Sequence, residues 1–282
     1  MVQRANKGAH LPKADGMKPV DFSAFVEDLA RVSADAILPF FRSAMHTTDK
    51  SNGGVFDPVT EADRAAETAM RRLIMRELPS HGIIGEEFGA HAPDSEFVWV
   101  LDPIDGTKSF ISGFPTWGTL IGLTHNKSPC YGMMHQPFTR EAFIGDGSGA
   151  LWRGLGRNGD KVERKLMTRK CASITEATLL TTHPALLAPG THDAYHRVEK
   201  EARLSRYGGD CYMYCMLASG HIDLVIESGL NAYDIVALIP IIEGAGGVIT
   251  SWDGGTAANG GAIIAAGDRR LHEQAMRLLA SA

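Results

Sequence analysis

The feature of this chain that most constrains its fold is an apolar run that ends in two carboxylates. Residues 97–101 have the composition of a buried strand, and Asp102-Pro103-Ile104-Asp105-Gly106-Thr107 follows at once. This order predicts a strand, a tight turn and the N-terminus of a helix. Such a turn could hold a divalent cation on its carboxylates and an anion on its N–H groups. A plain Asp-Gly turn needs neither, so the interpretation depends on further ligands elsewhere in the chain.

The length, composition and charge of the chain limit the functions in which this turn could take part. The chain has 282 residues, 44% hydrophobic and 22% charged, which is ordinary for a globular protein of one or two domains. Its net charge of -5 offers no basic footprint for nucleic acid, and no apolar stretch is long enough to span a membrane. The cysteines are too few for a disulfide framework, and we expect a cytoplasmic protein. They are Cys130, Cys171, Cys211 and Cys215.

The first half of the chain is predicted to contain helices followed by strands. Residues 1–20 are polar and are expected to form a disordered tail. Helical periodicity covers residues 21–41, and a second helix is predicted from Thr60 to about Leu78, where Thr60 and Asp63 have the spacing of a capping box. Strands are predicted at 83–84, 97–101, 118–123, 131–134 and 142–144.

The second half alternates helices and strands. Strands are predicted at 178–182, 222–226, 248–250 and 262–265, and helices at 192–204, 210–218, 233–244 and 268–279. The pattern predicts an α+β fold with layered elements. We expect one compact catalytic unit with an N-terminal half at 21–155, a C-terminal half at 156–282 and a soft boundary near 154–159.

Four further acidic residues lie at predicted element boundaries. Asp63 lies at the start of a helix, Glu86 and Glu87 follow a short strand, and Asp234 begins an apolar helix. A carboxylate next to an apolar helix face is costly without a partner, and converging carboxylates repel one another. A metal ion resolves both costs. Hard oxygen ligands without a Cys/His cluster favour Mg²⁺ over Zn²⁺.

From about residue 21 to its end, the sequence resembles the inositol monophosphatase family of Mg²⁺-dependent, lithium-inhibited phosphatases. The resemblance rests on the turn at 102–107, on Gly85-Glu86-Glu87, on Tyr233-Asp234-Ile235-Val236-Ala237 and on Gly244-Ala245-Gly246-Gly247. It implies a layered αβαβα sandwich of the kind shared with fructose bisphosphatases. It also implies a homodimer that acts on a small phosphate ester.

The resemblance also assigns roles to individual residues. Two or three Mg²⁺ ions are expected, held by the ligands Glu86, Asp102, the Ile104 carbonyl, Asp105 and Asp234. Gly106 and Thr107 are expected to bind the phosphate. Glu86 and Thr107 would orient the attacking water, and Asp63 would support Thr107. Lys50 would be the lysine of a mobile loop.

The alcohol released is expected to meet the second half of the chain. Glu227 matches a family position that contacts substrate hydroxyls. Asp210 stands where the inositol enzymes carry a small residue, and it is expected to bind substrate together with the preceding Gly209. Asp210 could instead be a helix N-cap bonded to the backbone. Two carboxylates suit a cationic alcohol, because a buried ammonium requires a partner. The stretches around Asp210 and Asp234 resemble the family branch that hydrolyses L-histidinol phosphate; inositol 1-phosphate and broad specificity remain open.

Other functions would also fit parts of this pattern. The carboxylates could form a structural Ca²⁺ site or belong to an inactive regulator, and bisphosphatases share the same metal motifs. Residues 154–159 fit the G-x-G-x-x-G pattern. They lack a βαβ context, however, so a surface hairpin or loop is predicted there rather than a dinucleotide site.

Overall fold

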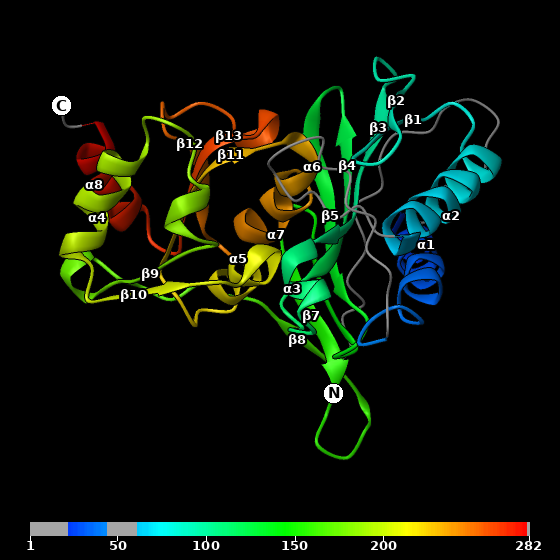
Figure 1. The fold of residues 1–282 in the computed structure, drawn as a ribbon, viewed down its shortest axis with the longest axis horizontal. Coiled ribbons are helices and arrows are strands. Elements are labelled where there is room, and N and C mark those ends of the chain that lie inside the picture. Colours follow the sequence, from blue (N-terminus) through cyan, green and yellow to red (C-terminus); the bar gives the residue numbers. More distant parts are fainter. Residues whose placement is uncertain (1–21, 44–60, 281–282) are drawn as a thin grey trace, which may run out of the picture.

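The fold is described by a computed structural model that covers residues 22–43 and 61–280 (Figure 1). The predicted tail at 1–20, the Thr60 end of the capping box and the expected loop lysine Lys50 lie outside these residues.

The first half of the chain builds an eight-stranded sheet. Its strands are ordered β2-β1-β3-β4-β5-β6-β7-β8. The pair β1–β3 is parallel and the other neighbours are antiparallel. The strands are β1 (Gly82–Gly85), β2 (Gly89–His91), β3 (Phe97–Asp105), β4 (Gly118–His125), β5 (Ser128–Gln136), β6 (Glu141–Gly145), β7 (Ala150–Leu155) and β8 (Lys161–Lys165).

The second half builds a smaller sheet of five strands in the order β10-β9-β11-β13-β12. The pairs β10–β9 and β9–β11 are parallel, whereas β13 is antiparallel to both of its neighbours. The strands are β9 (Thr178–Thr181), β10 (Leu204–Tyr207), β11 (Leu224–Leu230), β12 (Val248–Ser251) and β13 (Gly261–Ala266).

Helices form three layers around and between the two sheets (Figure 1). The helices α1 (Phe22–Ile37) and α2 (Glu61–Glu77) cover the outer face of the large sheet, and α4 (His192–Glu201) and α8 (Arg269–Ala280) cover that of the small sheet. Between the sheets lie α5 (Asp210–Ala218), α6 (Ala232–Ile235) and α7 (Leu238–Gly244). The predicted α+β sandwich of five layers is therefore confirmed.

Short helices complete the chain. The five-residue helix α3 (Thr107–Ile111) is separated from β3 by Gly106 alone. Three 3₁₀ turns are η1 (Ile174–Glu176), η2 (Pro184–Leu186) and η3 (Ala257–Asn259).

The packing follows from the apolar pattern of each layer. One core lies between α1, α2 and the large sheet and includes Leu29, Ile74 and Trp99, all fully buried. A second core fills the space between the sheets, where α7 contributes Leu238 and Ile241. In this central layer, α6 contacts β3 and α5 contacts β11.

Several segments differ from the prediction. The helix expected at 233–244 is divided into α6 and α7. Pro240 explains the division, because it has no N–H to donate to the Val236 carbonyl and its ring crowds that group. The helix expected at 192–204 ends at Glu201, since the chain turns there into β10.

The join expected between the halves lies in a hairpin. The segment at 154–159 connects β7 and β8, which form the predicted surface hairpin. The large sheet therefore continues to Lys165, and the boundary expected between residues 155 and 156 falls within this hairpin.

Candidate metal and substrate site

The turn after β3 presents two carboxylates of different burial. Asp102 lies within the strand and is only 1% exposed, whereas Asp105 ends the strand and is partly exposed. The register against β4 shifts between these residues, which marks an irregular end to the strand. Gly106 then takes a left-handed φ of 85°. A Cβ there would lie 2.8 Å from Asp210 Cγ, so this position requires glycine.

Asp234 joins the two carboxylates of this turn from a distant part of the sequence. One carboxylate oxygen from each of Asp102, Asp105 and Asp234 lies within 4.8 Å of the others. We call these three residues the carboxylate cluster. Asp234 is fixed by a capping box, in which its Oδ2 accepts the Asn231 N–H at 2.6 Å. Asp105 is fixed by the Cys211 N–H, which donates to its Oδ2 at 2.6 Å.

The electrostatics of the cluster call for a cation. Burial raises the pKa of Asp102, and the charges of Glu86 and Asp105 raise it further. Burial likewise raises the pKa of Asp105, together with the charge of Asp210, and raises that of Asp234 to about 6. Asp102 Oδ1 has no hydrogen-bond partner among the described residues. Repelling carboxylates with an unpartnered buried oxygen fit a hard divalent cation such as Mg²⁺.

Glu86 lies beside the cluster, in the loop between β1 and β2. It is not one of the three residues with mutually close oxygens, and the residue as a whole is exposed. Burial of its carboxyl group nevertheless raises its pKa to about 7; a hydrogen bond with Asp102 opposes this shift and the charge of Asp234 adds to it. The side chain is therefore within electrostatic reach of the cluster.

Three other predicted residues lie near the same turn. The Thr107 hydroxyl donates to the Ile104 carbonyl at 3.2 Å, so these two residues are joined directly. Asp63 is 3% exposed in the first turn of α2. Its charge is among those that raise the pKa of Asp102, which places it beside the cluster.

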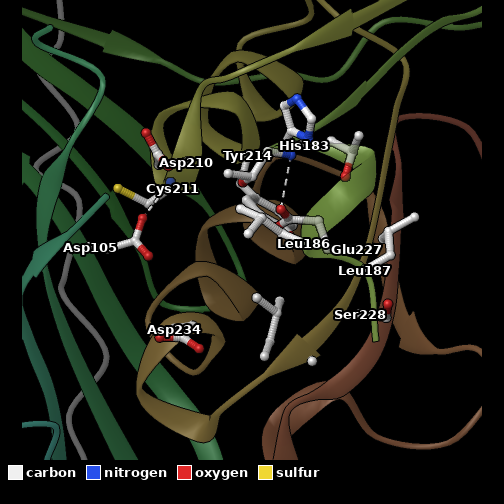
Figure 2. Close-up of a pocket in the computed structure, with 14 residues that line it drawn as sticks. Asp105, His183, Leu186, Leu187, Asp210, Cys211, Tyr214, Glu227, Ser228 and Asp234 are labelled. Atoms are coloured by element: carbon white, nitrogen blue, oxygen red, sulfur yellow. Dashed lines mark hydrogen bonds between the residues drawn. The ribbon is translucent and has the colours of Figure 1, made fainter. Parts of the chain in front are cut away.

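A cavity of about 210 Å³ adjoins the cluster (Figure 2). Four of its lining residues carry carboxylates: Asp105, Asp210, Glu227 and Asp234. The other lining residues are Thr181, Thr182, His183, Leu186, Leu187, Cys211, Tyr214, Ser228, Gly229 and Leu230. None of these described residues is Lys or Arg. The lining of the cavity is therefore acidic, and we refer to the cavity as the pocket.

Glu227 lies on β11 and is 7% exposed. Its Oε1 accepts the Thr182 N–H at 3.1 Å and its Oε2 accepts the Tyr214 hydroxyl at 2.8 Å. Burial raises its pKa to about 7. Sequence reasoning did not assign Tyr214 to the site, because a tyrosine among apolar helix residues carries no signal that its hydroxyl meets a carboxylate.

Asp210 lines the pocket but is bonded towards α3. Its Oδ2 accepts the Ser109 hydroxyl at 2.6 Å and the Thr116 hydroxyl at 3.3 Å. The alternative of an N-cap bonded to the backbone is wrong, since Gly209 is the N-cap of α5 and the Asp210 carboxylate accepts side-chain hydroxyls instead. In Figure 2, Asp105 and Asp210 lie on one side of the pocket and Glu227 on the other.

Sequence reasoning also missed Glu67, which is fully buried in α2. It accepts the Arg71 Nε–H at 2.6 Å and the Glu87 N–H at 2.7 Å, in the loop that carries Glu86. The i,i+4 spacing of Glu67 and Arg71 is the signal that could have drawn attention to it. That spacing alone is also typical of a solvent-exposed pair.

Comparisons with known proteins agree on one family. The model of the inositol monophosphatase family matches residues 19–282. The chain is 43% identical over 269 residues to the bifunctional phosphatase IMPL2, chloroplastic, of Arabidopsis thaliana, covering 92% of this chain and 75% of that protein. It is 32% identical over 224 residues to the histidinol-phosphatase of Mycobacterium tuberculosis, covering 79% and 84% of the two chains.

A solved structure agrees with these sequence relatives. An inositol monophosphatase from Zymomonas mobilis is 39% identical, with a TM-score of 0.80 over 92% of this chain and 97% of that one. Within residues 22–43 and 61–280, none of the helices combines the length and apolar character needed to cross a membrane. The chain therefore belongs to the inositol monophosphatase family and is a phosphoric monoester hydrolase.

Proposed function

We propose that this protein is a Mg²⁺-dependent phosphatase that hydrolyses L-histidinol phosphate to L-histidinol and phosphate. The observation that carries the proposal is the acidic pocket beside the carboxylate cluster, with Glu227 and Asp210 in its lining. The hydroxyls of a neutral alcohol can donate hydrogen bonds to these carboxylates. An amino alcohol gains more from them, because its ammonium group needs an anionic partner when it leaves water.

The cluster supplies the metal part of this proposal. Asp102, Asp105 and Asp234 would hold Mg²⁺, with Glu86 and the Ile104 carbonyl as further ligands. The ion would supply positive charge that activates a water and stabilises the leaving oxygen. The fit rests on the unpartnered Asp102 Oδ1 and on the convergence of the three carboxylates.

The turn at Gly106 would orient the phosphate. Its left-handed conformation starts α3, and the N–H groups of Gly106 and Thr107 are expected to donate to phosphate oxygens. Glu86 and Thr107 would orient the attacking water, with Asp63 supporting Thr107. The hydrogen bond that the Thr107 hydroxyl donates to the Ile104 carbonyl supports this proposal, because it keeps the hydroxyl at the turn.

The pocket would bind the alcohol that leaves. Glu227 is held rigidly by Thr182 and Tyr214, and it is the carboxylate that we expect to face the ammonium group. Asp210 would add negative charge from the other side of the pocket. Gly209, which has no side chain, would allow the substrate to approach. Lys50 remains a proposed loop residue.

Phosphate release tests this proposal. Purified protein is assayed with Mg²⁺ on L-histidinol phosphate, inositol 1-phosphate and a neutral sugar phosphate, and again with EDTA or Li⁺. We expect kcat/KM for histidinol phosphate to exceed the others by at least about tenfold, the value of one charge-assisted contact. EDTA should abolish release and Li⁺ should inhibit it. Comparable kcat/KM for inositol and histidinol phosphates would refute the substrate.

Inositol 1-phosphate is the second candidate substrate. It is favoured by the 39% identity with the Zymomonas mobilis inositol monophosphatase. The same panel decides between them, because an uncharged cyclitol should be insensitive to replacement of Glu227 by Gln.

Assembly and location complete the proposal. We propose a homodimer in the cytoplasm. Light scattering of the purified protein tests the first, and fractionation of the source cells tests the second.

A further inference from the structure

We propose that Glu67 is a positioning residue, which anchors the loop at 86–88 so that Glu86 is held beside the carboxylate cluster. The inference rests on the proposed function in one respect, because it takes Glu86 to be a metal ligand. It adds a residue from α2 that contacts none of the reacting groups.

The Glu67 carboxylate accepts three hydrogen bonds. Its Oε2 accepts the Glu87 N–H at 2.7 Å, and its Oε1 accepts the Phe88 N–H at 3.2 Å. The Arg71 Nε–H also donates to Oε1, at 2.6 Å. Since Glu67 is fully buried and Arg71 nearly so, these contacts are shielded from water, where charge-assisted bonds are strongest.

The loop is thereby fixed from both sides. The Glu86 N–H donates at 3.2 Å to the carbonyl of Leu101, which is the residue before Asp102. Glu87 and Phe88 donate to Glu67, and the Arg71 guanidinium also donates to the Gly89 carbonyl. The N–H groups of residues 86–88, at the tip of the β1–β2 hairpin, therefore all donate to acceptors in the protein and not to water.

Gly85 shows how closely Glu67 and the loop are fitted. A Cβ at Gly85 would lie 2.1 Å from Glu67 Oε1. Only glycine lets the strand end approach the buried carboxylate, so the loop and Glu67 form one unit.

An anchor is needed because Glu86 is exposed in a short hairpin loop, so burial of its own residue does not fix its position. The bonds from the Glu87 and Phe88 N–H groups to Glu67 restrict that loop. Loss of the anchor should therefore cost metal affinity, since ions would have to recruit Glu86 from a wider range of positions.

Binding of Mn²⁺ to the protein without substrate tests the inference. Free Mn²⁺ is followed by electron paramagnetic resonance during titration of the parent and of Glu67→Gln. The amide cannot accept bonds on both of its terminal atoms, so one loop N–H or the Arg71 Nε–H loses its acceptor. We expect the dissociation constant for Mn²⁺ to rise about 10- to 100-fold, the usual effect of losing a group that orients a ligand.

Asp223→Asn is the matched control. Asp223 is also a buried carboxylate, accepting the Arg169 Nε–H at 2.6 Å and the Thr178 N–H at 2.8 Å, but it serves the small sheet. The Asp223→Asn substitution should lower the melting temperature as Glu67→Gln does, and it should leave the Mn²⁺ affinity at the parental value. If Glu67→Gln fails to fold, Arg71→Lys replaces it, because it weakens the same anchor, and we expect a smaller rise in the dissociation constant.

Two results would overturn the inference. One is a folded Glu67→Gln protein, or a folded Arg71→Lys protein in its place, with parental Mn²⁺ affinity. The other is an equal loss of affinity in Asp223→Asn, which would make general destabilisation the cause. Neither result depends on the identity of the substrate. A parent protein that binds Mn²⁺ but does not hydrolyse histidinol phosphate would refute the proposed substrate and leave the role of Glu67 intact.

Discussion

The carboxylate cluster and the far side of the pocket use the same chemical group in opposite ways. In the cluster, Asp102 is almost fully buried and one of its oxygens has no partner among the described residues. Across the pocket, Glu227 is also buried, yet both of its oxygens accept hydrogen bonds. The difference indicates that the cluster is built to be completed by a cation, whereas Glu227 is already satisfied and rigid. Such a group is suited to selecting a substrate.

The most severe test of this contrast is removal of one cluster charge. We predict that Asp105→Asn lowers kcat/KM at least about a thousandfold, roughly 4 kcal/mol, because charge stabilisation in the transition state is lost. The amide oxygen can still accept the Cys211 N–H, so the melting temperature should not fall. Phosphate release and thermal melting measure the two effects. A folded variant with full Mg²⁺-dependent turnover would contradict the assignment of the cluster.

The second test uses pH. Burial raises the Glu227 pKa to about 7 in the folded protein, from 4.5 in the unfolded chain. Between these values the folded state holds the extra proton, so this stabilisation is complete below pH 4.5 and is lost as pH rises through 7. The loss should be roughly 3 kcal/mol. Denaturant unfolding in saturating Mg²⁺ and without substrate measures it, since the ion keeps the cluster ionised. Glu227→Gln should flatten this slope; an unchanged slope would contradict the burial effect.

Metal removal is the third test. With Mg²⁺ at about 100 times its dissociation constant, linkage predicts a stabilisation of about 2.7 kcal/mol. For a chain of this size, EDTA should then lower the melting temperature by roughly 5 to 10 °C. Asp102→Asn should show little or no shift, whereas Glu227→Gln should keep the parental shift. Equal shifts in both variants would remove the distinction between the two regions.

The smallest expected effect concerns substrate choice. Glu227→Gln should lower kcat/KM for histidinol phosphate about tenfold, near 1.4 kcal/mol, because the ammonium group loses its anionic partner. The value for a neutral inositol phosphate should stay close to that of the parent. Asp210→Ala is the comparison variant, and we expect a smaller loss, since its carboxylate already accepts two hydroxyls on the α3 side. Equal losses for both substrates would show that Glu227 shapes the pocket without selecting charge.

Local patterns identified much of the fold. The periodicity of α1 and α2 and the apolar run of β3 were recognised because side-chain spacing depends on neighbours in the sequence. The polar strands β2 and β8 were not predicted as strands, since they are recruited by pairing with β1 and β7 and carry little strand signal of their own. The division between α6 and α7 had a local cause in Pro240, which the apolar pattern obscured.

The site divides in the same way. By itself, the sequence determined the turn at 102–107 and the acidic residues at element ends, because strand, turn and left-handed glycine are encoded within a few residues. Only the tertiary structure brought Asp234 to Asp102, turned Asp210 towards Ser109, bonded Glu227 to Tyr214 and placed Glu67 beneath the Glu86 loop. These contacts join separate layers of the sandwich. Their partners are chosen by packing and burial, which no local pattern specifies.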